Sequence, residues 1–172
     1  MFFGSGLRRC FRCGIIHVRK LGKGSEFTVY LEEFRVGMTL DIPEAVIDKE
    51  EMLRFARLYD PLPLHTDEEY AKTTRFGAVI APGVMSFMAV WAKFMENDIF
   101  ADELIAGKST KIEWFKPVFA EDVLTGKLRV SAVTPRNPYN GIVETTIDVY
   151  NQHSEKVLSN ITESIVKRKA PV

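Results

Sequence analysis

Two side chains with acid–base chemistry lie five residues apart in a proline-rich stretch. Asp60 is followed by the sequence Pro-Leu-Pro-Leu and then by His65. An imidazole changes its protonation near neutral pH, which suits a general base, and a neighbouring carboxylate can orient a water molecule or carry its proton. Five extended residues would span roughly 17 Å, so the chain must fold back before the two side chains can act together.

A long apolar segment begins shortly after this pair, at Pro82 and Gly83. Proline is well tolerated where a helix starts, and every residue from Val84 to Ala92 except Ser86 is apolar, which predicts a helix buried on all sides. Residues 79–82 contain no Ser, Thr, Asp or Asn, so we expect the first amides of this helix to lack a side-chain cap. These amides, with Gly83 as the main candidate because it has no side chain, could bind a developing negative charge.

Each member of the acid–base pair also has a structural interpretation. Asp60 follows a predicted helix and precedes a proline, a position where the side chain often bonds to local amides. His65 precedes a capped helical turn and could pack against Tyr70. The pair in combination with Gly83 favours a functional interpretation.

The composition is that of one ordinary globular domain. The chain has 172 residues, of which 46% are hydrophobic and 27% charged. The 23 basic and 23 acidic residues cancel, which argues against a dedicated nucleic-acid-binding protein. No apolar run is long enough to span a bilayer, so we expect no membrane association. Two cysteines are too few to staple a fold of this size, and a reducing compartment, the cytoplasm, is the expected location.

The first 24 residues differ from the rest. They hold six Arg or Lys, five Gly and no acidic residue, without apolar periodicity, which predicts a poorly ordered extension that fold and catalysis do not need. The segment fits either a mitochondrial-type presequence, which would place the protein in the matrix, or a leader without a role. Its Cys10-x-x-Cys13 is a weak zinc or redox signal, best explained as two incidental thiols. The single domain is therefore predicted over residues 25–172.

The remaining pattern predicts one sheet and one long helix. Alternating polar and apolar residues favour extended segments at 27–31, 39–46, 109–116, 123–134, 143–149 and 156–167. Asp48 and the apolar spacing after it predict a helix over 49–59, which Pro61 and Pro63 prevent from continuing. Thr66 to Glu69 has the form of a capping box that starts a short helix through Lys72. Long antiparallel strands with one apolar face around one buried helix predict an α+β fold with a curved sheet.

Several of these residues match one family pattern. The chain contains Asp60-Pro-Leu-Pro-Leu-His65, Tyr70-Ala71, Phe76-Gly77 and Ile80-Ala-Pro-Gly-Val-Met85, and later Pro117-Val118 and Asp122-x-Leu124. Over residues 33–168 this resembles the MaoC-like, or (R)-specific enoyl-CoA hydratase, family, which has the hotdog fold. Leu62 stands where the motif has Asn, Pro82 where it has His, and Glu121 where it has Gly.

The resemblance implies a hydratase or dehydratase, a carbon–oxygen lyase acting on enoyl-CoA or 3-hydroxyacyl-CoA thioesters of fatty acid metabolism. It implies that Asp60 and His65 activate water and that the Gly83 amide binds the thioester oxygen. Pro82 and Val84 beside Gly83, and Lys72 and Arg75 near the site, are candidates for substrate contact, although a solvated surface explains the two cations equally well. It also implies a homodimer or higher homo-oligomer and no metal or redox cofactor, the coenzyme A thioester being the substrate.

Two alternative functions stay open at this point. Hotdog proteins also hydrolyse acyl-CoA thioesters, usually with an acid on the central helix, but this helix has no acid before Glu96. A non-catalytic acyl-thioester-binding module is the other alternative, since Leu62 and Pro82 depart from the catalytic pattern.

Overall fold

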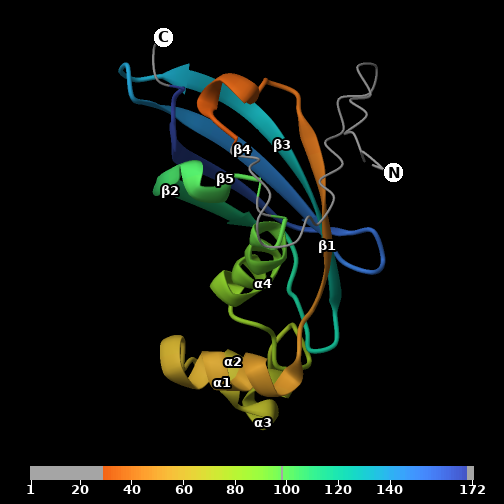
Figure 1. Cartoon of the computed structure of the whole chain (residues 1–172). Helices are drawn as coiled ribbons and strands as arrows, with labels where there is room; N and C mark the ends of the chain where they lie inside the picture. The colour runs from red at the N-terminus through yellow and green to blue at the C-terminus, as the bar shows by residue number, and fades with distance from the viewer. Residues whose placement is uncertain (1–28, 98, 170–172) are drawn as a thin grey trace, which may run out of the picture.

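One antiparallel sheet of five strands forms the framework of the protein. The computed structural model describes residues 29–97 and 99–169. The strands are β1 (Thr39–Val46), β2 (Leu104–Trp114), β3 (Val123–Pro135), β4 (Asn140–Tyr150) and β5 (Lys156–Lys167), and their order across the sheet is β1-β3-β4-β5-β2. All four neighbouring pairs are antiparallel. The long strands β3, β4 and β5 therefore make the centre, and β1 and β2 are the edges (Figure 1).

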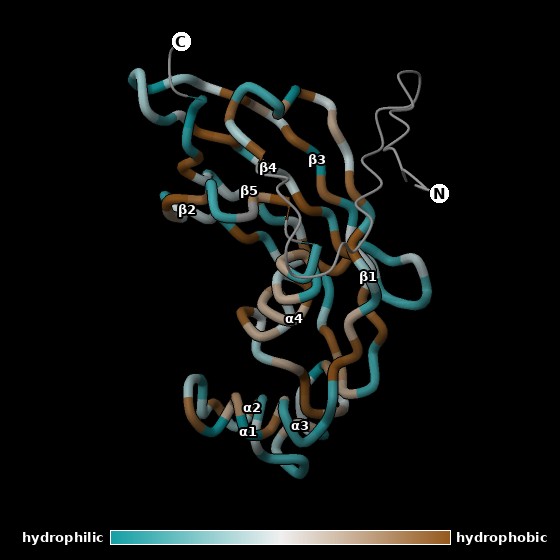
Figure 2. The backbone as a smooth tube through the Cα atoms, viewed as in Figure 1, coloured by the Kyte–Doolittle hydropathy of each residue, from teal (hydrophilic) through white to brown (hydrophobic). Residues whose placement is uncertain are grey.

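The strands form because their side chains alternate between a buried and a partly solvated face. In β4, every second residue from Gly141 to Val149 is buried. Buried Ile147 lies opposite buried Leu128 of β3, so the register brings apolar side chains together on one face. The alternation is visible in Figure 2 as brown and teal bands along β3 and β4.

The sheet curves around α4 (Gly83–Met95), which packs chiefly against β1 and β3. Phe87, Val90 and Phe94 of α4 are buried in the core. The prediction that α4 is buried on all sides is wrong, since Val84, Met88 and Met95 are 50%, 45% and 38% exposed. The curved sheet of one chain covers one side of the helix, and an apolar stripe stays open on the other side.

Three helices lie together at one end of the molecule, below the sheet in Figure 1. They are α1 (Lys49–Tyr59), α2 (Pro63–Thr66) and α3 (Glu68–Thr73). Helix α1 matches its predicted range, and the Asp48 carboxylate accepts the Glu51 amide at 2.8 Å, as expected of an N-cap. The predicted cap of α3 is one residue off. Asp67, not Thr66, accepts the amides of Glu69 and Tyr70, because Thr66 still belongs to α2.

The other sequence predictions differ mainly at the ends of elements. Strand β2 runs over 104–114 rather than 109–116, and β4 extends beyond 143–149 at both ends. Leu31, expected in a strand, starts a short 3-10 helix, Leu31–Glu33, and a second one is Ala101–Glu103. The predictions for residues 1–24, with Cys10 and Cys13, lie outside the described residues. Within residues 29–97 and 99–169, no helix has the length and hydropathy to cross a membrane.

Candidate active site

The loop between α1 and α3 brings Asp60 and His65 together. Asp60 is the C-cap of α1, and His65 lies in the single turn of α2. The Oδ2 atom of Asp60 is 3.5 Å from Nε2 of His65. The imidazole is buried, whereas the Asp60 side chain is 40% exposed. The pair therefore has one buried partner and one that faces the solvent.

His65 is held from the other side by the backbone. Its Nδ1 atom lies 2.8 Å from the carbonyl oxygen of Ile80. A carbonyl oxygen can only accept, so Nδ1 carries the proton and, in the neutral ring, Nε2 has a free lone pair. That lone pair faces the Asp60 carboxylate, which also only accepts. A water molecule, which has two protons to donate, is the natural partner for both atoms.

The loop folds back through a one-turn helix. The His65 amide donates to the Leu62 carbonyl at 2.8 Å, and the Asp67 amide donates to that of Pro63 at 2.9 Å. The Leu62 side chain, which replaces the amide of the family motif, is 54% exposed and contributes no polar contact. Backbone hydrogen bonds therefore form this turn without a side chain at residue 62 that could brace it.

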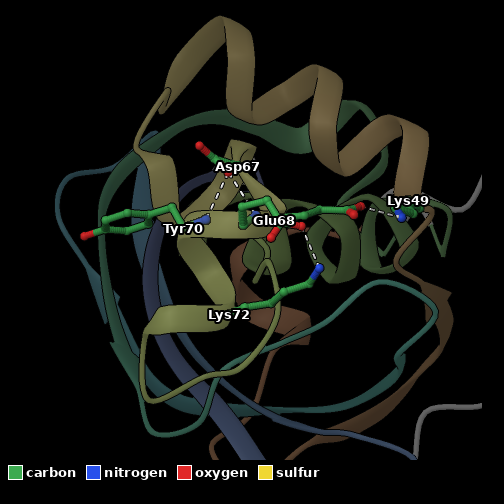
Figure 3. Close-up of polar contacts among 6 residues, drawn as sticks. Lys49, Asp67, Glu68, Tyr70 and Lys72 are labelled. Carbon is green, nitrogen blue, oxygen red and sulfur yellow. Dashed lines mark hydrogen bonds and ion pairs between the residues drawn. The ribbon is translucent and has the colours of Figure 1, made fainter.

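The turn is continued by α3, whose start is tied to α1. Figure 3 shows the Asp67 carboxylate at the amides of α3 and Lys49 of α1 reaching Glu68, 3.0 Å away. The hydrogen bond from Lys49, with its charge, holds the pKa of Glu68 below its usual value. Both side chains are exposed, so this ion pair positions the helices weakly and adds little stability.

Helix α4 begins without a side-chain cap, as predicted from residues 79–82. Pro82 is the N-cap and makes no capping hydrogen bond through its side chain. The first intrahelical hydrogen bond is donated by the Ser86 amide to the Pro82 carbonyl, so the amides of Gly83, Val84 and Met85 have no acceptor among the described residues. Gly83 lies three residues after Ile80, which holds His65. The uncapped helix start and the acid–base pair are therefore joined by one short segment.

That segment is fixed by a second one that the sequence reasoning did not assign to the site. The Ala81 amide donates to the Val118 carbonyl at 2.7 Å, and Ile80 pairs with Phe119 in an isolated β-bridge. Buried Asp122 accepts the Phe119 amide at 2.8 Å and the side-chain amide of Gln152 at 2.8 Å. Asp122 thus positions the segment at Phe119, which pairs with the segment that carries the acceptor of His65. The Asp122-x-Leu124 pattern in the sequence marks Asp122, but it does not show that the segment at Phe119 pairs with the one at Ile80.

The other predicted substrate residues make no hydrogen bond or ion pair with Asp60 or His65 within the described chain. Lys72 makes an ion pair with Glu69 at 2.7 Å, and the Arg75 guanidinium lies 4.8 Å from the centre of the Phe76 ring. Pro82 is buried, whereas Val84 is half exposed. Lys72 and Arg75 are both exposed, which fits a solvated surface as well as contact with a phosphate.

A shallow groove of about 310 Å³ lies between α1 and α4, and Glu51 and Arg54 contribute to its lining beside apolar side chains. Its apolar lining comes from Phe55, Leu58, Tyr59, Met85 and Met88. Tyr59 directly precedes Asp60, and Met85 belongs to the first turn of α4. The groove therefore ends close to both parts of the candidate site.

Comparison with known proteins agrees with this fold. Residues 33–153 match the family described as MaoC like domain. The protein YdeM of Bacillus subtilis (strain 168), which is uncharacterized, is 30% identical over 139 residues, covering 80% of this chain and 99% of YdeM.

Two solved structures are also similar. A monoamine oxidase regulatory protein from Archaeoglobus fulgidus has a TM-score of 0.74 and 28% identity over 83% of this chain and 96% of its own. A MaoC-like dehydratase from Rhodospirillum rubrum has a TM-score of 0.71 and 29% identity over 84% and 99% of the two chains. The chain belongs to the MaoC-like domain family, and its curved sheet around α4 is the hotdog fold of that family.

Proposed function

We propose that the protein adds water to an enoyl-CoA thioester, or removes it from a 3-hydroxyacyl-CoA thioester. The observation that carries this proposal is the pair of acceptors facing each other, Nε2 of His65 and Oδ2 of Asp60, 3.5 Å apart beside the start of α4. Family membership supports a hydratase or dehydratase, and the Rhodospirillum relative is named a dehydratase.

In the hydration direction, the pair would hold a water molecule by its two protons. The water oxygen forms a bond to C3 of the enoyl group while Nε2 of His65 takes one of its protons. The electrons of the double bond move toward the thioester oxygen. The proton on Nε2 of His65 then passes to Oδ2 of Asp60, 3.5 Å away, and Asp60, the more exposed of the two groups, delivers it to C2. The imidazole is neutral again and the carboxylate is ionised again, so both side chains end as they began.

The negative charge on the thioester oxygen needs a donor. The uncapped amides at the start of α4, with Gly83 first, are the candidates, since they point along the positive end of the helix dipole. Fixed donors of this kind can lower a barrier by roughly 3–4 kcal/mol each. The groove between α1 and α4 is the candidate surface for the acyl chain.

Thioester hydrolysis fits less well. It needs a water molecule aimed at the carbonyl carbon, and residues 83–95 of α4 contain no carboxylate. Glu96, the first acid after the helix begins, is at its far end and pairs with Lys93 at 2.9 Å. Glu96 is therefore more than three helical turns away from the start of α4, where the candidate site lies.

One assay separates the possible functions. The full chain is incubated with crotonyl-CoA while the enoyl absorbance and the release of free thiol are followed. We expect the absorbance to fall without thiol release. Thiol release with the double bond intact would assign a thioesterase, and no turnover on several chain lengths, together with measurable binding, would assign a binding module.

We also propose that the protein works as a homodimer. The exposed apolar stripe of α4 and the edge strand β2, where Ile105 is 49% exposed, support a second copy as their cover. Light scattering at micromolar concentration should give a dimer, and Ile105→Lys should weaken it, whereas Lys108→Arg on the same strand should not. A fully active wild-type monomer would contradict the proposal.

A further inference from the structure

The indole of Trp114 lies directly on Gly83. A Cβ atom added to Gly83 would be 2.7 Å from both Cε2 and Nε1 of Trp114 and 3.2 Å from its Cδ1. These three atoms belong to the five-membered ring, so the part of the indole that carries the N–H group is the part that meets Gly83. Steric room for this ring, rather than an unusual backbone conformation, is what requires glycine at residue 83.

Trp114 and His65 are attached to opposite ends of the same short segment. His65 binds the Ile80 carbonyl, and Trp114 packs on Gly83. Gly83 is the third residue after Ile80, which limits the distance between their Cα atoms to about 10 Å. The Ala81–Val118 hydrogen bond and the Ile80–Phe119 bridge hold the segment next to the chain that continues from β2, so Trp114 has a fixed position.

The indole has a free donor at this point. An indole nitrogen donates and cannot accept, and Nε1 of Trp114 makes no hydrogen bond to any residue that the structure describes. The ring is 50% exposed although it is a large aromatic group. Beside it lies Gly83, whose amide, like those of Val84 and Met85, also lacks an acceptor within the described chain. A backbone donor and a side-chain donor therefore meet at one partly exposed place.

We propose that Trp114 contacts the substrate, its indole lying beside the thioester group and its Nε1–H donating a second hydrogen bond to the thioester oxygen next to the amide of Gly83. The inference rests on the proposed function, because it assigns the thioester to the start of α4. The same ring would limit the width of the site on the side of β2, so that a branched substituent next to the carbonyl would meet the indole.

The experiment uses the fluorescence of the residue itself. The chain has two tryptophans, so Trp91→Phe leaves Trp114 as the reporter, and Trp114→Phe leaves Trp91 as the matched control. Butyryl-CoA, a saturated thioester that cannot be hydrated, is titrated into each variant, with free coenzyme A in parallel. We expect a saturable emission change with butyryl-CoA in Trp91→Phe, a much smaller one with coenzyme A, and none in Trp114→Phe.

Kinetics with crotonyl-CoA give a second readout. Trp114→Phe keeps an aromatic ring and removes the donor, so we expect kcat to fall about 10- to 100-fold with KM changed less than about 3-fold. A structural role alone would lower the melting temperature and leave kcat in place. Unchanged turnover in a folded Trp114→Phe variant would overturn the proposal.

The outcomes also separate this inference from the proposed function. Butyryl-CoA that binds by calorimetry without changing the Trp114 emission would overturn the role of Trp114 and leave the acyl-thioester site standing. If the emission of Trp114 changes when the protein is diluted but not when butyryl-CoA is added, Trp114 belongs to a subunit contact. That result would also overturn its proposed role in substrate binding. An emission response without hydration of crotonyl-CoA would retain the Trp114 contact and reject the hydratase.

Discussion

Nδ1 of His65 lies 2.8 Å from the carbonyl oxygen of Ile80, and this contact decides which ring nitrogen faces Asp60. The backbone acceptor keeps the proton on Nδ1, so Nε2 is left to accept one. The same contact joins the loop after α1 to the segment before α4. One hydrogen bond thus sets both the tautomer of the proposed base and its place beside the helix start.

Asp60→Asn tests the carboxylate of the pair. The substitution keeps the size of the side chain and removes its ability to carry the proton, so we expect kcat for crotonyl-CoA hydration to fall by ~10²–10⁴-fold. The Asp60 carboxylate accepts no backbone amide in the described chain, so the melting temperature should hardly change. Asp41→Asn, the same change at an exposed residue of β1, is the control and should keep full activity. Full activity in Asp60→Asn would remove this residue from the site.

His65→Ala should affect both activity and stability. The imidazole is buried, and its loss leaves the Ile80 carbonyl without its side-chain partner, which costs about 1–3 kcal/mol of unfolding free energy. Loss of the base should lower kcat by ~10²–10⁴-fold. Denaturant unfolding measured beside the kinetics separates the two effects. A variant that loses stability but retains turnover would mean that His65 only supports the loop.

Glu121→Gly should stabilise the protein. Glu121 has φ +66°, in the left-handed region that disfavours residues with a Cβ, and its amide donates to the Ile47 carbonyl at 2.8 Å. Relief of this strain, reduced by the greater flexibility of glycine in the unfolded chain, should raise the unfolding free energy by about 0.5–1 kcal/mol. Glu44→Gly in β1 is the matched control and should lower it by a similar amount. The prediction fails if both substitutions destabilise equally.

Asp148 should make stability depend on pH in the acid range. Partial burial raises its pKa, but hydrogen bonds from Lys156 and Ser159 and the charge of Lys156 outweigh this, and the pKa is lowered overall. Because its pKa is lower in the folded state, the ionised carboxylate stabilises the protein at pH values above its unfolded-state pKa of roughly 3.9. This stabilisation is lost as the pH falls through the folded-state pKa. Asp148→Asn should therefore be less stable than wild type near pH 6, with the difference shrinking below about pH 3.9. In the Asp148→Asn background, the further substitution Lys156→Gln should leave the pH dependence of stability nearly unchanged.

The sequence predicted best those elements that local chemistry defines. Helix α1 was placed over its exact range because Asp48 caps it and its apolar spacing is regular, and the range of β5 was also matched. Strand β2 was placed less well, because nearly all its side chains are exposed at the sheet edge and alternation says little about its ends. The exposed stripe of α4 could not be predicted, since the apolar sequence does not say which side the sheet covers.

The same distinction applies to the site. Asp60 and His65 are close in sequence, so a proline-rich turn was enough to suggest that they act together. Ile80, Trp114 and Asp122 join the site through pairing between distant segments, and this pairing depends on the folded sheet. Catalytic roles for Asp60 and His65 remain predictions that the variants above test, and the role of the Gly83 amide remains a prediction.

Helices α1, α2 and α3 pack mainly on one another at one end of the molecule, away from the long ladders of β3, β4 and β5. Such a unit can open while the central ladders stay closed, and its free energy of opening is then smaller than that of global unfolding. Native-state hydrogen exchange should therefore show the amides of His65 and Asp67 exchanging well before those of β4. Because both proposed proton carriers lie in this unit, turnover should disappear on warming before the sheet melts, and thermal inactivation would report a partial opening rather than loss of the fold.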